Sequence, residues 1–232
     1  MRSSLLLLAL FTLSFTTARA SDDLLLCVVT ARRARSYLPE AVAALKGQGG
    51  NFVVVDVDNS TLPSMVGAVV RLDAQAVECT ESGRVSCAVQ QQASDVVRAL
   101  EACGGMGGSK WVALVEDDML ACDRALATME NVLSKLHRFK TARFARFSRA
   151  VVFPSARIAA YAAFVRARIH ETPYDILLNF DDWAPGIDYI HHQSLFAHMG
   201  AVSTVAERND PAYIAKYGSL RDEACGSALV GK

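Results

Sequence analysis

Three consecutive acidic residues, Glu116, Asp117 and Asp118, directly follow the apolar run 111–115 (WVALV). A continuous apolar run of this kind predicts a buried parallel strand. Ligands of open α/β sheets bind beyond the carboxyl ends of the strands, so the acidic residues lie where a site is expected. In an extended chain, the side chains of Glu116 and Asp118 point to one side and that of Asp117 to the other.

Two carboxylates on one side suit a hard divalent cation such as Mn²⁺ or Mg²⁺. Such a cation can hold a nucleotide diphosphate and neutralise the charge that develops as this group leaves. The alternative is a solvated acidic strand end, although three adjacent like charges repel one another when no cation is present. The residue types alone leave both interpretations open.

Two further segments contain residues that could take part in chemistry. His198 in segment 194–200 (SLFAHMG) is a candidate metal ligand or base, or a packed core histidine. Asp175 in segment 171–178 (ETPYDILL) lies near an expected helix start, where it is either an N-cap or a general base. His191 and His192 would face opposite ways on an extended chain, so we expect loop residues rather than a ligand pair.

The first half of the chain alternates between strand and helix patterns. The expected strands cover residues 24–30, 52–57, 68–72 and 111–115, and the expected helices cover residues 37–46, 89–103 and 124–138. Residues 74–87 are expected to form a loop. This alternation predicts an α/β fold with a mostly parallel sheet flanked by helices, in a single domain.

The second half of the chain is less regular. The patterns predict one or two strands in 142–153, a helix at 155–169, a helical turn at 173–178, a loop at 181–193 and a strand at 194–199. The basic stretch 138–149 alternates with phenylalanines and is interpreted as a solvated strand face rather than a nucleic-acid site.

Length and charge narrow the class of protein. The chain has 232 residues, which suits one domain, and its 24 basic residues balance its 24 acidic residues. This balance gives no electrostatic reason to expect nucleic acid or an anionic membrane as a partner. No GxSxG, HExxH or P-loop pattern is present.

The first residues are typical of a signal peptide. Arg2 precedes a short apolar segment at 5–15, and residues 18–20 (ARA) form a small-x-small cleavage pattern. The apolar segment is shorter than the about 20 residues that a membrane-spanning helix needs. We expect a signal peptide at 1–20, a mature domain at 21–232 without a later membrane span, and a location in the secretory pathway (the Golgi or ER lumen) or outside the cell.

Cysteine usage agrees with export. All six cysteines follow the expected cleavage site, and an oxidising lumen permits disulfides. Cys79 and Cys87 could close a short loop, while the other pairings stay open. The cysteine spacings contain no CxxC pair, which argues against a structural zinc site. Residues 59–61 (NST) form an N-glycosylation sequon.

These fragments occur in the order of a known family. The chain resembles GT-A glycosyltransferases of the N-acetylglucosaminyltransferase IV type (alpha-1,3-mannosyl-glycoprotein 4-beta-N-acetylglucosaminyltransferase), and their relatives that add N-acetylgalactosamine to GPI anchors. The similar segments span about residues 25–205. They are 29–33 with 36–38 (family TVKR…SYL), 91–97 (KQ..DY), 111–119 (QLEDDI), 146–148 with 157–164 (FS…FRSSDL), 172–178 (KPxDWLL) and 194–200 (SLFQHMG).

The resemblance implies a Rossmann-like GT-A domain and a metal site. Glu116 and Asp118 would hold a divalent metal, with Mn²⁺ the first choice, together with the diphosphate of a UDP-sugar donor. His198 matches the position of a C-terminal metal-ligating histidine, and Asp117 would contact the ribose or the sugar of the donor.

The resemblance also implies roles for four other residues. Asp175 would be the catalytic base, Thr30 and Arg33 would lie against the nucleotide, and Asp58 would meet the base or ribose. The implied reaction is an inverting displacement, in which Asp175 takes a proton from an acceptor hydroxyl as UDP leaves. Asn179 stands where the family often has Asp, and Ile176 stands in place of its Trp.

The expected function is transfer of an N-acetylhexosamine, with N-acetylglucosamine favoured, from a UDP-sugar to a glycan acceptor such as an N-glycan mannose. One alternative is N-acetylgalactosamine transfer to a GPI-anchor glycan. A second is a noncatalytic protein that binds glycans or nucleotide sugars on the same fold. A third is a metal-dependent hydrolase, which requires further carboxylate or histidine ligands.

Overall fold

A seven-stranded sheet forms the centre of the computed structural model, which describes residues 22–31, 36–58, 68–79, 85–145, 149–199 and 224–227. Its strands are β1 (Leu24–Thr30), β2 (Phe52–Asp56), β3 (Val69–Arg71), β4 (Trp111–Glu116), β6 (Phe139–Arg143), β7 (Ala150–Pro154) and β8 (Ile187–Ile190). The spatial order is β3-β2-β1-β4-β7-β6-β8. Of these strands, only β7 runs against its neighbours, so the predicted, mostly parallel sheet is confirmed.

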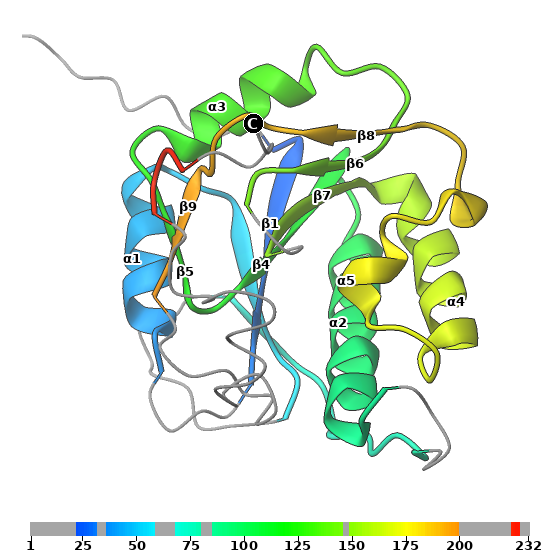
Figure 1. Cartoon of the computed structure of the whole chain (residues 1–232). Helices are drawn as coiled ribbons and strands as arrows, with labels where there is room; N and C mark the ends of the chain where they lie inside the picture. The colour runs from blue at the N-terminus through cyan, green and yellow to red at the C-terminus, as the bar shows by residue number, and fades with distance from the viewer. Residues whose placement is uncertain are drawn as a thin grey trace, which may run out of the picture.

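Helices cover both faces of this sheet (Figure 1). They are α1 (Leu38–Gly47), α2 (Cys87–Gly105), α3 (Ala125–Leu133), α4 (Ile158–Arg168) and α5 (Tyr174–Leu177), with 3-10 turns η3 (Ser155–Arg157) and η4 (Asp181–Trp183). Side chains of α1 and α3 pack in one core cluster, and those of α2, α4 and α5 pack in the other. The α/β architecture predicted from the sequence is therefore confirmed.

The continuous apolar sequence of β1 follows from its central position. Leu25 and Cys27 belong to the cluster under α2, whereas Leu24, Leu26 and Val28 belong to the cluster under α1 and α3. A strand buried on both faces has no position for an alternating polar residue. The same explanation holds for β4, which lies beside β1.

A separate two-stranded ribbon pairs β5 (Met119–Ala121) with β9 (Phe196–His198) (Figure 1). Met119 lies opposite His198, and the Met199 amide donates a 2.8 Å hydrogen bond to the Asp118 carbonyl. The sequence predicted β9 but not β5, because a three-residue strand next to acidic residues has too little apolar pattern. This ribbon brings the ends of two distant segments together.

The expected loop at 181–193 is wrong in part, because it contains η4 and the edge strand β8. Ile187 and Ile190 of β8 are exposed, so this strand lacks the buried alternation that identifies a strand in a sequence. The helix expected at 124–138 is also shorter, since α3 ends at Leu133 and the chain then turns into β6.

The interpretation of 138–149 as a solvated strand face is wrong for β6. The Lys140 side chain is completely buried, and its Nζ lies 3.0 Å from both Asp188 Oδ2 and the Phe180 carbonyl oxygen. Its ammonium group also lies 5.6 Å from the centre of the Trp183 ring. A buried cation needs such partners, and they come from segments that are remote in the sequence.

All six cysteines are paired, as Cys27–Cys103, Cys79–Cys87 and Cys122–Cys225. The first bond joins β1 to α2 across the core, and the second closes the short loop that the sequence suggested. The third ties residues 224–227 to the chain next to the ribbon, where the Ser194 amide donates to the Ser227 carbonyl at 2.7 Å. Within the described ranges, no helix has the length and apolar character needed to cross a membrane.

The two disulfides that join α2 should differ in their effect on stability. Their sequence separations are 76 residues for Cys27–Cys103 and 8 residues for Cys79–Cys87. Loop-closure entropy predicts a loss of about 4.5 kcal/mol for Cys27→Ala/Cys103→Ala and about 2.5 kcal/mol for Cys79→Ala/Cys87→Ala. Urea unfolding under non-reducing conditions measures both, and an equal loss in the two double variants would contradict the expected dependence on loop length.

Candidate functional site

The three carboxylates at the end of β4 contact three different elements. Glu116 Oε1 accepts a 3.3 Å hydrogen bond from the Tyr174 hydroxyl at the start of α5. Asp117 Oδ2 accepts a 2.6 Å hydrogen bond from the Thr30 hydroxyl at the end of β1. Asp118 Oδ2 lies 3.2 Å from Nε2 of His198 in β9. One short acidic segment thereby connects β1, α5 and the ribbon.

The backbone does not stay extended through this segment. Strand β4 ends at Glu116, and Asp117 and Asp118 form a turn before β5 begins. The alternation that would place Glu116 and Asp118 on one side therefore does not continue past the strand. Glu116 instead lines a pocket on the α2 face, and Asp118 contacts the ribbon.

Asp117 and Thr30 form a buried pair. Asp117 is 0% exposed and Thr30 is 3% exposed. The Asp117 amide also donates to the Val29 carbonyl at 3.1 Å, so both its backbone and its side chain bind β1. This pair fixes the turn after β4 against the neighbouring strand, and a contact of either residue with a nucleotide stays a prediction.

Asp118 and His198 provide donor atoms that suit a divalent cation. Their side chains are only 5% and 7% exposed, and both lie next to the turn between β4 and β5. Carboxylate oxygen and imidazole nitrogen are both metal ligands, and a cation that also binds a diphosphate needs only a few protein ligands. Among the described residues no third acidic, histidine or cysteine side chain joins them, so Glu116 is not part of this group.

A pocket of about 270 Å³ opens on the α2 face, at the carboxyl ends of three strands. Val29, Ala31, Val57 and Glu116 come from the ends of β1, β2 and β4 or the residues that follow. The remaining lining comes from β4 and α2: Leu114, Ala88, Gln91, Gln92, Asp95 and Val96. It is the location that the strand order predicts for a ligand of an α/β sheet.

The polar groups of α2 in this pocket are held in defined positions. Gln91 Nε2 donates to Asp95 Oδ1 at 3.0 Å, and Gln91 also binds the loop at the Val77 amide and the Gln75 carbonyl. Burial raises the pKa of Asp95, although hydrogen bonds from Gln91 and Arg98 oppose this shift. Gln92 Oε1 is buried, and no described residue donates a hydrogen bond to it.

Sequence reasoning did not select Gln91, Gln92 or Asp95 as site residues. The only signal was the resemblance of segment 91–97 to the KQ..DY motif, since a polar residue on a helix has no pattern that separates a pocket from solvent. Asp58 directly follows Val57, which lines this pocket, and its charge is the smallest contribution to the raised pKa of Asp95. Arg33 and residues 1–21, which include the expected signal peptide, lie outside the described residues.

Asp175 lies in the first turn of α5, and the N-cap position belongs to Pro173. The N-cap interpretation is therefore wrong, and Asp175 Oδ1 accepts a 3.0 Å hydrogen bond from the next amide, that of Ile176. Burial raises the pKa of Tyr161 well above its ordinary value, and the Asp175 carboxylate adds to this shift while Arg143 opposes it. Asp175 directly follows Tyr174, whose hydroxyl binds Glu116 and whose carbonyl accepts a 2.8 Å hydrogen bond from the Tyr161 hydroxyl.

Comparison with known proteins assigns no family. No family model and no curated protein matches the chain. Among solved structures, 2-C-methyl-D-erythritol 4-phosphate cytidylyltransferase from Thermus thermophilus is 14% identical, with a TM-score of 0.46 over 83% of this chain and 98% of that chain.

Two glycosyltransferases are similar to the same low extent. One, involved in the glycosylation of the major capsid of PBCV-1, is 12% identical, with a TM-score of 0.46 over 80% of this chain and 98% of that chain. The other is the mannosyltransferase PcManGT from Pyrobaculum calidifontis in complex with GDP-Man and Mn²⁺. It is 11% identical, with a TM-score of 0.39 over 73% of this chain and 56% of that chain.

The Thr30–Asp117 hydrogen bond should contribute measurably to stability. Thr30→Val keeps the shape of the side chain but removes the donor to a buried carboxylate, which should lower the free energy of unfolding by about 2 kcal/mol. Thr30→Ser retains the hydroxyl and should recover most of this loss. Urea unfolding measures both variants, and a Thr30→Val variant as stable as the parent would show that this bond does not hold the turn.

Proposed function

We propose that this chain is a metal-dependent glycosyltransferase that uses a UDP-sugar. The observation that carries the proposal is the position of the pocket beside the acidic turn. Glu116 lines the pocket, and two residues later Asp118 meets His198. We infer that a nucleoside in the pocket would extend its diphosphate past Glu116 toward this pair, which would hold the cation.

The pocket suits a nucleoside in size and lining. Its walls are mostly apolar, formed by Val29, Val57, Val96 and Leu114, and can pack against a flat base. Asp95 and Gln92 offer acceptors for the N–H groups of a base, and Glu116 offers an acceptor for ribose hydroxyls. We infer that Thr30, Arg33, Asp58 and Asp117 support or contact this nucleotide, as the family resemblance implies.

Asp118 and His198 are the residues that would hold the cation, for which Mn²⁺ is the first choice. When bound, such a cation would bind the donor diphosphate and stabilise the charge on the leaving UDP. The hydrolase alternative is disfavoured, because it requires more protein ligands than the described residues bring together. A transferase needs fewer, since its donor supplies oxygen ligands.

Asp175 is the proposed base for the acceptor hydroxyl. It follows Tyr174, whose hydroxyl binds Glu116, so α5 places this carboxylate at the same edge as the pocket. The exposed side of α5 leaves room for an acceptor glycan to approach. The proposed reaction is inverting transfer of N-acetylglucosamine to an N-glycan mannose, with N-acetylgalactosamine transfer to a GPI glycan as the alternative within this class.

The proposed location is the lumen of the secretory pathway. Three disulfides suit an oxidising compartment, and the signal-like segment 1–20 would direct the chain there. A noncatalytic protein that binds nucleotide sugars would share this location, so activity has to be tested directly.

Two substitutions separate donor binding from transfer. Asp118→Asn should abolish Mn²⁺-dependent UDP binding, because it removes the charged ligand. Asp175→Asn should leave UDP binding within about twofold and lower transfer by about 100-fold or more, because it removes only the base. Calorimetric titration with UDP, with and without Mn²⁺, and transfer assays with a panel of UDP-sugars and glycan acceptors measure the two effects.

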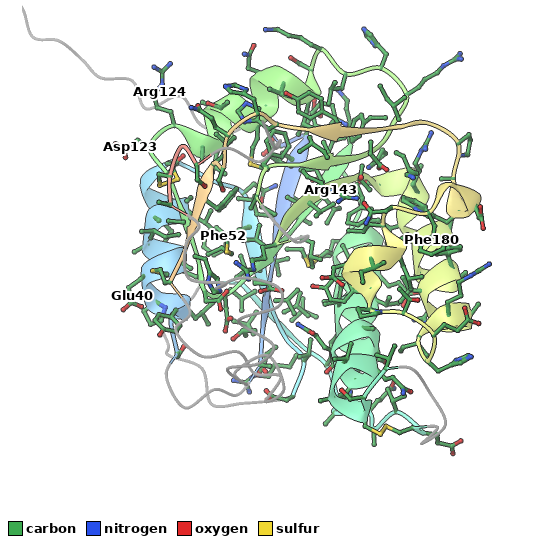
Figure 2. The ribbon with its side chains drawn as sticks, in the orientation of Figure 1. Glu40, Phe52, Asp123, Arg124, Arg143 and Phe180 are labelled. Carbon is green, nitrogen blue, oxygen red and sulfur yellow. A yellow bond between two sulfur atoms is a disulfide. The ribbon has the colours of Figure 1, made fainter. Side chains whose placement is uncertain are left out.

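Asp123→Asn is the matched control, because Asp123 is exposed and follows the opposite end of β5 from Asp118 (Figure 2). This variant should bind UDP and transfer sugar like the parent. Full transfer by Asp175→Asn would reject the assigned base. UDP binding without transfer to any acceptor in the parent would instead favour the noncatalytic alternative.

A further inference from the structure

Arg143 places a cation at the same edge of the sheet as the proposed site. It is the last residue of β6, which runs parallel to β4 because β7 lies antiparallel between them. The carboxyl ends of β4 and β6 therefore meet at one edge, separated by the single strand β7. Figure 2 shows Arg143 next to the short helix α5.

The partner of this cation is neutral. Nη2 of Arg143 donates a 2.7 Å hydrogen bond to Oδ1 of Asn179, which follows α5. Nε of Arg143 is buried, and no acceptor in the described ranges binds it. No carboxylate among the described residues forms an ion pair with Arg143, so its charge is oriented but not neutralised.

Arg143 and Asp175 are linked through the short segment that contains α5. Arg143 binds Asn179, and the hydroxyl of the buried Tyr161 donates a 2.8 Å hydrogen bond to the Tyr174 carbonyl, directly before Asp175. The Asp175 carboxylate raises the pKa of Tyr161 and Arg143 lowers it. Asn179, which binds Arg143, is four residues after Asp175, so one short segment carries both the proposed base and the partner of Arg143. A ligand that reaches Asp175 is therefore within the field of the Arg143 charge.

We propose that Arg143 binds an anionic group of a substrate, a phosphate or a carboxylate, beside Asp175. The guanidinium group has five N–H donors in a planar fork that matches such anions, and Asn179 uses only one of them. Two sources of the anion fit: a charged group on the acceptor sugar, or the diphosphate of the donor. The inference rests on the proposed function for the identity of these substrates.

Paired titrations of the full disulfide-bonded chain with Mn²⁺ test this proposal and separate the two sources. Mannose 6-phosphate compared with mannose probes an acceptor anion, and UDP compared with uridine probes the donor diphosphate. An oriented guanidinium should give a preference of about tenfold for the charged member of one pair. Arg143→Gln should lower the preference in that pair by about fivefold or more, and the preference that the Mn²⁺ site gives to UDP should remain.

Asn179→Asp is the sharper variant, because it changes the charge without changing the volume. An aspartate at 179 would neutralise Arg143 and should reduce the same preference as Arg143→Gln does. Arg143→Lys should retain part of the preference, because the charge remains. Arg138→Gln, at the exposed opposite end of β6, is the matched control and should behave like the parent.

Unchanged ratios for both pairs in a folded Arg143→Gln or Asn179→Asp variant would overturn the proposal. If Arg143→Gln does not fold, as judged by thermal unfolding, the Asn179→Asp result decides alone. A parent chain that shows an Arg143-dependent preference for phosphate but neither binds UDP nor transfers sugar would support the anion site and reject the glycosyltransferase proposal. Failure of the Arg143 anion site and failure of the glycosyltransferase proposal therefore give different results.

Discussion

Repulsion among the carboxylates of Glu116, Asp117 and Asp118 constrains the structure around the end of β4. Adjacent like charges beside an apolar core are unfavourable unless each finds a partner or a cation. Here each carboxylate has a different partner, in β1, α5 or β9. These contacts add to the apolar packing of α5 and of the β5–β9 ribbon, which bury Leu177 and Phe196 in the two core clusters.

This arrangement gives the carboxyl edge of the sheet a defined order of chemical groups. The largely apolar pocket with its polar groups from α2 lies on one face, and the Asp118–His198 pair lies at the ribbon. Asp175 directly follows Tyr174, whose hydroxyl binds Glu116, and Arg143 binds Asn179 just after α5. In the proposed reaction, the nucleobase would lie in the pocket, the diphosphate at Asp118 and His198, and the acceptor beside Asp175.

The sequence predicted those features that depend on local pattern. The fully apolar runs of β1 and β4 identify central strands, and the short Cys79–Cys87 loop is visible from spacing alone. The order of motifs also pointed to Glu116, Asp118, Asp175 and His198, and the structure brings Asp118 and His198 together.

The sequence did not predict features that depend on contacts between residues far apart in the chain. The buried Lys140 needs Asp188 and Trp183, the strand β8 has exposed isoleucines, and the pairings of Cys27 and Cys122 depend on the tertiary fold. The pocket residues of α2 were missed because Gln91, Gln92 and Asp95 look like any polar helix surface. The turn after β4 changes the direction of the Asp118 side chain, since the strand ends at Glu116, two residues before Asp118.

The most direct test of the central claim is anomalous diffraction at the manganese edge, on crystals of the chain grown with Mn²⁺ and UDP. The account predicts one strong peak within bonding distance of Asp118 and His198, and uridine in the pocket lined by Val57, Asp95 and Glu116. A manganese peak elsewhere, or UDP bound away from this pocket, would contradict it.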